Sequence, residues 1–379
     1  MQLSIFDDIV TEIPETQGIK YAGSKMRLLP YILNAAKKVN PKSVMDCFSG
    51  TTRVSQAFAK TGHLVKCNDR AIWSKIFGEC YLLNKYNKAH YEKIIDHLNS
   101  LPPTEGWFTE MYSGIDMDGS AIQKNGKKAL WQKHNTAKLD AIRPEIDRLG
   151  LSGIERSVIL TSLILALDKI DNTMGHYVSY LKDWSPRSYN RLTLEVPDLY
   201  VDDNNHIVSH GDVFDFISNN SADLAYLDPP YGSNNEKMPP SRVRYASYYH
   251  IWSTVILNDK PELFGSVNRR VDSRDDVCGS LFEEYRKNHN GRFIAVEAIE
   301  RLIKEIKAKY ILLSYSSGGR ATAQELNDVF SASGEIIQFE KIDYKKNVMA
   351  NMKWTNEWLR ENDDQENKEY LILIKMKGS

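Results

Sequence analysis

The sequence predicts an α/β protein with a largely parallel sheet and a second, mostly helical domain inserted into it. Short runs rich in Val, Ile, Leu and Tyr recur along the chain, and longer helix-compatible segments separate them. Several of these runs are continuously apolar rather than alternating, which is typical of strands covered by helices on both faces. The predicted strands are residues 43–47, 64–68, 206–209, 224–227, 310–315, 335–340 and 370–375.

Two long gaps interrupt the alternation of strands and helices, one at residues 68–206 and one at 231–293. Gaps of this length are typical of inserted domains or functional loops rather than of plain connections. We therefore expect a catalytic domain at 18–74 and 200–379 and an inserted domain at 75–199. Helices are predicted at residues 30–38, with Pro in the first turn, 52–60 and 293–307.

Composition excludes several classes of protein. The chain has 379 residues, of which 42% are hydrophobic and 26% are charged, so a disordered, collagen-like or coiled-coil protein is excluded. It carries 49 Lys and Arg against 50 Asp and Glu, for a formal net charge of -1. Binding to nucleic acid would therefore need a local basic surface.

The chain shows no signal for export, for a membrane span or for a metal site. Its longest nearly apolar run is too short to span a bilayer, and Asp7 and Asp8 stand where a signal peptide carries Lys or Arg. We expect a cytoplasmic protein with buried, reduced thiols and no metal, because the cysteines form no CxxC pair. They are Cys47, Cys67, Cys80 and Cys278.

The strongest chemical signal is Asp228-Pro229-Pro230-Tyr231, which directly follows the predicted strand at 224–227. Ligands bind at the carboxyl ends of strands in open α/β sheets. The amino group of a nucleobase is a poor nucleophile, but the Asp228 carboxylate and the Pro229 carbonyl can each accept one N–H and free its lone pair. The prolines hold these acceptors rigidly, and Tyr231 offers a face for stacking an extruded base. The alternative is an ordinary Pro-Pro turn.

A second signal lies in the first predicted strand–turn–helix unit. Gly50 allows close approach of the backbone to a ligand there, and the segment is not GxGxxG, so a hydride-transferring enzyme loses support. The next strand ends in Asn68-Asp69, where an acid is well placed to accept hydrogen bonds from ribose hydroxyls. A helix cap is the alternative for Asp69 by itself, and its spacing after Gly50 favours ribose binding.

Two shorter segments are ambiguous by themselves. In Tyr21-Ala22-Gly23-Ser24-Lys25, the lysine either reaches a carboxylate or is simply solvated. In Gly211-Asp212-Val213-Phe214, the acid either accepts from an adenine amino group, with the Val213 N–H donating to the ring, or caps a helix.

Taken in this order, the segments resemble the Dam-like, class alpha, adenine-specific DNA methyltransferases. The resemblance covers about 18–69 and 206–375. It implies a Rossmann-like sheet of seven strands that binds S-adenosylmethionine, with catalysis at Asp228, Pro229, Pro230 and Tyr231. Many members carry a second Gly where Thr52 stands, so the turn here must tolerate a side chain. The implied cofactor-binding residues are Tyr21, Lys25, Asp46, Phe48, Ser49, Gly50, Asp69, Asp212 and Val213.

The implied activity is methyl transfer to the N6 amino group of an adenine flipped out of duplex DNA, in a restriction-modification or phage modification setting. No Pro-Cys pair occurs in the chain, which argues against a cytosine ring-carbon methyltransferase with a thiolate nucleophile. The alternatives are an RNA base or protein glutamine methyltransferase and a catalytically silent DNA-binding protein. We expect a monomer that binds double-stranded DNA, no membrane, and a restriction endonuclease that can be encoded nearby without binding.

Three segments supply candidate DNA contacts. Residues 119–139 contain five lysines and no acid, which indicates either a phosphate-binding patch or one solvated helix face. Residues 176–187 interleave aromatic and basic side chains, and residues 242–250 place arginines and aromatics shortly after the proposed catalytic segment. The candidate residues are Lys124, Lys127, Lys128, Tyr180, Lys182, Arg187, Arg242 and Arg244.

Overall fold

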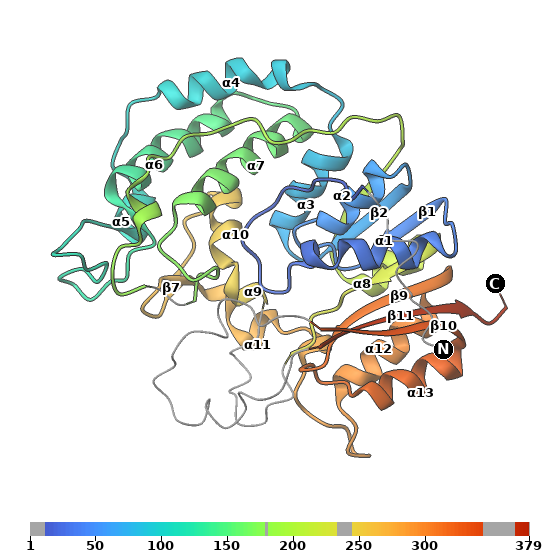
Figure 1. The fold of residues 1–379 in the computed structure, drawn as a ribbon. Helices are drawn as coiled ribbons and strands as arrows, with labels where there is room; N and C mark the ends of the chain where they lie inside the picture. The colour runs from blue at the N-terminus through green and yellow to red at the C-terminus, as the bar shows by residue number, and fades with distance from the viewer. Residues whose placement is uncertain (1–11, 179–180, 233–244, 344–367, 379) are drawn as a thin grey trace.

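A seven-stranded sheet forms the centre of the protein in the computed structural model, in the order β10-β11-β9-β6-β1-β2-β5 (Figure 1). All seven strands overlap strands that the sequence predicts. The structure describes residues 12–178, 181–232, 245–343 and 368–378. The strands are β1 (Ser43–Asp46), β2 (Leu64–Asp69), β5 (Ile207–His210), β6 (Ala222–Leu227), β9 (Ala308–Ser316), β10 (Gly334–Asp343) and β11 (Lys368–Met376).

The direction of the strands brings the carboxyl ends of five of them to one edge of the sheet. Strands β9, β6, β1, β2 and β5 run parallel, and β11 runs antiparallel to both β9 and β10. The carboxyl ends of the five parallel strands therefore lie along one edge. The chain proceeds outward from β1 through β2 to β5 on one side, and then through β6 to β9 on the other. The strand order reverses between β1 and β6, which is where open α/β sheets bind ligands.

Helices cover both faces of the sheet, which explains the continuously apolar strands. Along β6, Leu224 and Tyr226 pack in one hydrophobic cluster, and Ala225 and Leu227 pack in the other, and all four are buried. The first cluster contains residues of α1 (Leu29–Lys37) and α2 (Arg53–Lys60). The second contains residues of α8 (Val213–Asn219), α12 (Ile294–Glu305) and α13 (Ala323–Ser333).

The segment between β2 and β5 is mostly helical, as the sequence predicts, and lies to one side of the sheet (Figure 1). It contains α3 (Ile72–Gly78), the π-helical turn η2 (Glu79–Leu83), α4 (Lys88–Ser100), α5 (Trp107–Tyr112), α6 (Lys133–Arg148), α7 (Gly153–Ile170) and η3 (Pro186–Tyr189), with the short strands β3 (Ser113–Gly114) and β4 (Trp131–Gln132). Helix α7 is largely buried and begins with a capping box between Ser152 and Glu155.

The two gaps of the sequence pattern share one hydrophobic cluster. Helix α10 (His250–Leu257) contributes Ile251, Trp252 and Val255 to the cluster that also contains Ile159 and Leu163 of α7. The second gap thus completes the core of the helical segment. Its other elements are α9 (Tyr245–Tyr248), β7 (Leu263–Phe264), β8 (Arg269–Arg270), η5 (Val271–Ser273), α11 (Asp275–Cys278) and η6 (Leu281–Glu283).

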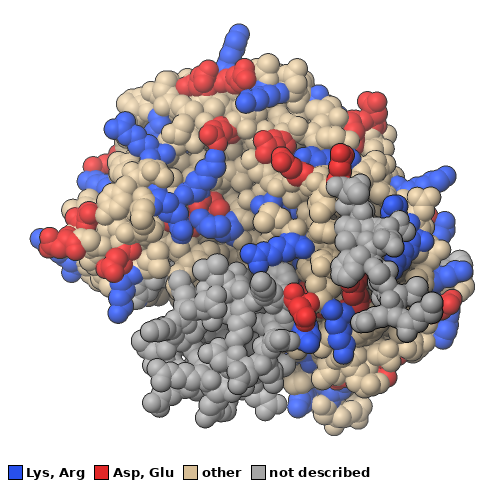
Figure 2. Space-filling view, in the orientation of Figure 1, with Lys and Arg blue, Asp and Glu red and all other residues tan. Residues whose placement is uncertain are grey.

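Three further features are the distribution of charged side chains, the apolar character of the helices and the exposure of the cysteines. Both Lys and Arg and Asp and Glu side chains are spread over the face seen in Figure 2. Within the described residues, no helix has the length and apolar character needed to cross a bilayer. Cys47, Cys67 and Cys80 are buried, as predicted, but Cys278 is partly exposed because the one-turn helix α11 lies at the surface.

Candidate active site

A cavity of about 520 Å³ opens at the carboxyl ends of β1, β2 and β6. This volume lies in the range of small-molecule and cofactor sites. Every residue to which the sequence analysis gives a catalytic or cofactor role lines the cavity: Tyr21, Lys25, Asp46, Phe48, Ser49, Gly50, Asp69, Asp212, Val213, Asp228, Pro229, Pro230 and Tyr231. Residues from five separate stretches of the chain thus converge on one pocket.

Lys25 and Asp228 form an ion pair in the wall of this cavity. Lys25 begins the 3₁₀ turn η1 (Lys25–Arg27) and is only 5% exposed. Its Nζ lies 2.8 Å from Asp228 Oδ1 and 3.3 Å from Glu369 Oε1, and it donates to the Gly23 carbonyl at 3.2 Å. The same ammonium lies 5.7 Å from the centroid of the Tyr231 ring. The lysine therefore links the N-terminal segment to the Asp-Pro-Pro-Tyr turn.

Burial and neighbouring charges set the ionisation of this pair. Burial raises the pKa of Asp228 to about 6, with Lys25 lowering it and Glu369 raising it. Burial lowers the pKa of Lys25, but Asp228 and Glu369 outweigh that effect and hold its pKa well above the usual value. Asp228 is consequently an ionised acceptor at neutral pH, and it titrates closer to neutrality than an exposed carboxyl.

Glu369 is a residue that the sequence analysis did not single out, and it contacts Lys25 behind the cavity wall. It stands in β11, is 6% exposed, and accepts a 2.7 Å hydrogen bond from Ser314 Oγ of β9. A single acid near the start of the last strand belongs to no motif. Only the pairing of β11 with β9 brings it beside Lys25.

Asp69 fixes the turn that follows β1. Its Oδ2 accepts from Gly50 N and its Oδ1 from Ala71 N, both at 2.8 Å. Ala71 is the N-cap residue of α3, so Asp69 also supports the start of that helix. Burial raises the pKa of Asp69 against the lowering effect of these N–H donors. The carboxylate lies in the cavity wall, where its remaining lone pairs are available to ligand hydroxyls.

The turn after β1 accommodates a side chain at Thr52 in a strained backbone conformation. Gly50 has φ +47° and Thr52 has φ +59°, both in the left-handed region. That region is a genuine outlier for a β-branched residue. The Thr52 hydroxyl donates to Thr51 O at 2.7 Å and accepts from Gln56 Nε2 at 3.1 Å. These bonds hold the threonine at the position where the resembled family often has glycine.

Asp46 presents a buried acceptor that the protein leaves free. Its Oδ2 accepts from Ser55 Oγ at 2.6 Å, whereas Oδ1 has no hydrogen-bond partner among the residues that the structure describes. Burial raises the pKa of Asp46 to about 7, with Ser55 opposing the shift and Asp228 adding to it. The carboxyl group of Asp46 forms part of the cavity wall, as does that of Asp69.

Aromatic rings form two walls of the cavity. Phe282 of η6 lies 5.1 Å from Phe48 and 6.1 Å from Phe214, centroid to centroid, and these rings bound one side of the cavity. Near Asp228, Tyr245 of α9 lies 5.5 Å from Tyr21. The sequence analysis did not single out Phe282, and Tyr245 belongs to the candidate DNA-contact segment 242–250. Asp212 is the N-cap of α8, with Oδ1 accepting from Phe214 N at 2.8 Å.

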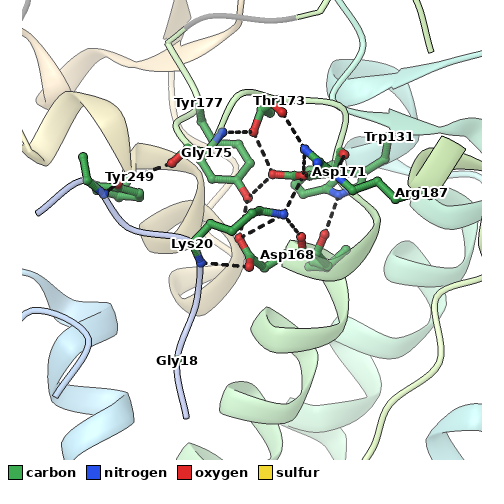
Figure 3. Close-up of polar contacts among 12 residues, drawn as sticks. Gly18, Lys20, Trp131, Asp168, Asp171, Thr173, Gly175, Tyr177, Arg187 and Tyr249 are labelled. Carbon is green, nitrogen blue, oxygen red and sulfur yellow. Dashed lines mark hydrogen bonds and ion pairs between the residues drawn. The ribbon is translucent and has the colours of Figure 1, made fainter. Parts of the chain in front are cut away.

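A buried network ties the N-terminal segment of the site to the helical segment (Figure 3). Lys20 N donates to Asp168 Oδ2 at 3.0 Å, and Lys20 Nζ lies 2.9 Å from Asp171 Oδ1. Asp171 is 0% exposed and also accepts from the Tyr177 hydroxyl at 2.8 Å. Two residues beyond Lys20, Ala22 N donates to the Tyr249 hydroxyl at 2.7 Å. The position of the Lys25 segment therefore depends on the helical layer.

The candidate DNA-binding residues have different surroundings. Lys124, Lys127 and Lys128 lie in a loop closed by a bridge between Ile122 and Lys128, so they are not on a helix face. Lys124 is exposed, and Lys127 Nζ donates to Glu110 O at 3.2 Å.

Lys182 is also exposed, whereas Arg187 donates within the protein to Asp171 and to the Thr173 carbonyl. Tyr180, Arg242 and Arg244 lie outside the described residues. Arg187, Lys127 and Lys128 thus each have a hydrogen-bond partner within the protein, and only the Arg187 contacts include a buried carboxylate.

Comparison with protein families decides the classification of this fold and site. The model of the D12 class N6 adenine-specific DNA methyltransferases matches residues 21–277, which is more than half of the chain. The chain belongs to this family. The matched range begins at Tyr21 and includes the Asp-Pro-Pro-Tyr turn, but it ends before Glu369.

Relatives of this D12 class chain are modification methylases. It is 27% identical to modification methylase LlaI of Lactococcus lactis subsp. lactis, over 86% of this chain and 51% of the relative. It is 29% identical to modification methylase StsI of Streptococcus sanguinis, over 88% and 50%. The chain thus spans about half the length of these two relatives. It is also 24% identical to the type II methyltransferase M.NlaIII of Neisseria lactamica, over 88% of this chain and 94% of the relative.

Proposed function

We propose that this chain transfers a methyl group from S-adenosylmethionine to the N6 amino group of a flipped adenine in double-stranded DNA, as the modification enzyme of a type II restriction-modification system. The observation that carries this proposal is the Asp228 carboxylate at the carboxyl end of β6, held by Lys25 in the cavity that also contains Asp46 and Asp69. Membership of the D12 class supports adenine N6 as the target.

Asp46 and Asp69 are the residues that would hold the cofactor, through its ammonium and its ribose. The rings of Phe48, Phe214 and Phe282 bound the same side of the cavity. Bound there, S-adenosylmethionine supplies a methyl group whose bond to sulfur breaks with the electron pair left on sulfur. Positioning of the adenine amine against that group then supplies much of the rate acceleration.

The chain's own residues prepare the amine and remove its proton. Asp228 and the Pro229 carbonyl each accept one N–H of the amine, so the nitrogen lone pair is freed for attack. Asp228 takes the proton that nitrogen releases, and Tyr231 stacks on the adenine ring. Flipping the base costs a few kcal/mol, which stacking of about 1–3 kcal/mol partly offsets.

The helical segment at 75–199 is the proposed target-recognition domain, with α10 completing its core. It carries Lys124, Lys127, Lys128 and Lys182. Phosphate contacts from these lysines would place the duplex over the site. The network around Asp171 supports this arrangement, because it joins the recognition segment to the loop that carries Lys25.

The experiment that tests this function measures transfer of a labelled methyl group to duplex DNA, to RNA and to protein. We expect transfer to adenine in duplex DNA only. In Asp228→Ala, transfer should fall below detection while the cofactor still binds, and Lys25 keeps Glu369 as its counter-charge. Asp215→Ala, an exposed acid of α8, is the matched control and should stay active. Methylation of RNA or protein alone, or turnover by Asp228→Ala, would contradict the proposal.

A further inference from the structure

We propose that Glu369 is a positioning residue for methyl transfer, which shares the Lys25 ammonium with Asp228 and thereby keeps the Asp228 carboxylate available to the substrate amine. This inference rests on the proposed function. Glu369 lies in β11, beyond the residues matched by the family model.

The contacts of Lys25 show how the ammonium is shared. A lysine ammonium has three N–H groups. The three oxygens around Lys25 Nζ are Asp228 Oδ1 at 2.8 Å, Gly23 O at 3.2 Å and Glu369 Oε1 at 3.3 Å. The lysine therefore donates a hydrogen bond to Gly23 O and forms ion pairs with both carboxylates, between which it stands.

The sheet holds Glu369 in place for this contact. The residue is 6% exposed, and Ser314 Oγ of the neighbouring strand β9 donates to its Oε1 at 2.7 Å. In the β11–β9 pairing, Glu369 lies opposite Ser316. A buried carboxylate is costly unless it is paired and hydrogen-bonded, and Lys25 and Ser314 satisfy both requirements. Glu369 is thus a rigid part of the site rather than a surface acid that happens to approach it.

The charges of Lys25, Asp228 and Glu369 determine how available the Asp228 carboxylate is to the substrate amine. One ammonium faces two carboxyl groups in the buried cluster of Lys25, Asp228 and Glu369, so the acidic groups of the cluster outnumber its one base. Without the Glu369 charge, Lys25 would pair with Asp228 alone and withdraw the lone pairs that the substrate amine needs. Lys25 lowers the pKa of Asp228 and Glu369 raises it, in the direction that preserves its basicity.

Among the other titratable groups that face Asp228, Asp69 raises its pKa as Glu369 does, and the tyrosine hydroxyls are neutral near pH 7. These groups are the carboxyl groups of Asp46 and Asp69 and the hydroxyls of Tyr21, Tyr226, Tyr231 and Tyr245. None of them supplies a positive charge. Glu369 differs from them because it contacts the Lys25 ammonium directly.

The test uses Glu369→Gln, which keeps the shape of the side chain and an acceptor for Ser314 but removes the charge. We expect the single-turnover rate on duplex DNA to fall about tenfold, while dissociation constants for DNA and cofactor stay within about twofold. The acid limb of the pH–rate profile should move to lower pH, because a negative charge that raised the pKa of Asp228 is gone. Glu335→Gln, an exposed acid of β10, is the control and should change neither quantity.

A second measurement does not depend on turnover. Carbon-13 NMR of Asp-labelled protein without cofactor follows the Asp228 carboxyl, assigned by its loss in Asp228→Asn. The midpoint should be lower in Glu369→Gln than in the wild type and unchanged in Glu335→Gln. If Glu369→Gln does not fold, Ser314→Ala releases the anchored acid and should shift the midpoint in the same direction.

An unchanged Asp228 midpoint together with an unchanged rate would overturn the role of Glu369. Absence of methyl transfer by the wild-type protein would instead overturn the proposed function, and the NMR midpoint would still decide whether Glu369 controls Asp228. A lower rate with unchanged midpoint and acid limb would assign Glu369 a purely structural role and also overturn the proposal.

Discussion

Ser55 Oγ donates a 2.6 Å hydrogen bond to Asp46 Oδ2 and leaves Asp46 Oδ1 buried without a partner among the described residues. An unpaired buried carboxylate costs stability when it is ionised. Asp46 lines the cavity, and under the proposed function the ammonium of the cofactor offsets this cost.

Asp46→Asn should therefore separate binding from stability. The amide cannot pair with an ammonium, so we expect the dissociation constant for S-adenosylmethionine to rise at least tenfold, measured by calorimetry. Burial raises the pKa of Asp46 to about 7. Because the pKa of Asp46 is raised in the folded state, its ionisation lowers stability progressively from its ordinary pKa up to about 7 and by the full amount above 7, so Asp46→Asn should melt higher than the wild type at about pH 8. An unchanged affinity would remove Asp46 from the cofactor site.

The pH dependence of the reaction should report the Lys25–Asp228 pair. Asp228 acts only when it is ionised, so the rate should fall as the pH drops through about 6, the pKa to which burial raises this carboxyl. In Lys25→Met the positive charge that lowers the pKa of Asp228 is absent, and the acid limb should move to higher pH. Initial rates of methyl transfer measured across the pH range give both pH–rate profiles. A shift of the acid limb to lower pH in Lys25→Met would contradict this assignment.

Backbone strain at Thr52 predicts an order of stability for two variants. Thr52→Ala and Thr52→Gly both lack the hydroxyl that bonds Gln56 and Thr51. A backbone φ of +59° destabilises the folded state by about 1 kcal/mol when the residue is alanine, but not when it is glycine. Urea unfolding should therefore find Thr52→Gly more stable than Thr52→Ala by about that amount. Equal stability of the two variants would show that the turn relaxes.

The loop lysines should govern the salt dependence of DNA binding. Replacing Lys124, Lys127 and Lys128 together by Ala should weaken binding to every duplex. It should also reduce the slope of log affinity against log salt by about 0.9 for each phosphate that the protein no longer neutralises. Fluorescence anisotropy across a salt series measures this slope. Replacing Lys37 of α1, Lys42 just before β1 and Lys304 of α12 gives the matched control of equal charge. Equal slopes in the two triple variants would show that the loop lysines do not contact DNA phosphates.

The Asp171 network should contribute more to stability than an exposed ion pair. Asp171 is 0% exposed and receives bonds from Lys20, Tyr177 and Arg187. Asp171→Asn should lower the free energy of unfolding by about 2 kcal/mol, since charge-assisted hydrogen bonds are removed. Glu195→Gln removes the partner of Lys169 in a pair whose side chains are 61% and 69% exposed, and should cost less than about 1 kcal/mol. Similar decreases in the free energy of unfolding of the two variants would show that the Asp171 network contributes no more to stability than an exposed ion pair.

The sequence by itself determined the strands of the sheet and the motif residues of the cavity wall. The central strands were readable because a strand buried on both faces must be continuously apolar, as Leu224 to Leu227 are. The residues of the Asp228 turn and of the Gly50 turn were readable because each follows directly on its strand, and parallel strands bring their carboxyl ends to one edge.

Only the tertiary structure decided which charges meet. Glu369 reaches Lys25 because β11 pairs with β9, and α10 completes the helical core because the chain returns to it after the Asp228 turn. Arg187 likewise turns inward to Asp171, although its neighbours in sequence suggest a DNA-facing loop. Such contacts join residues far apart in the chain, and no local period or spacing encodes them. They follow from packing, in which a buried charge must find its partner wherever the fold places one.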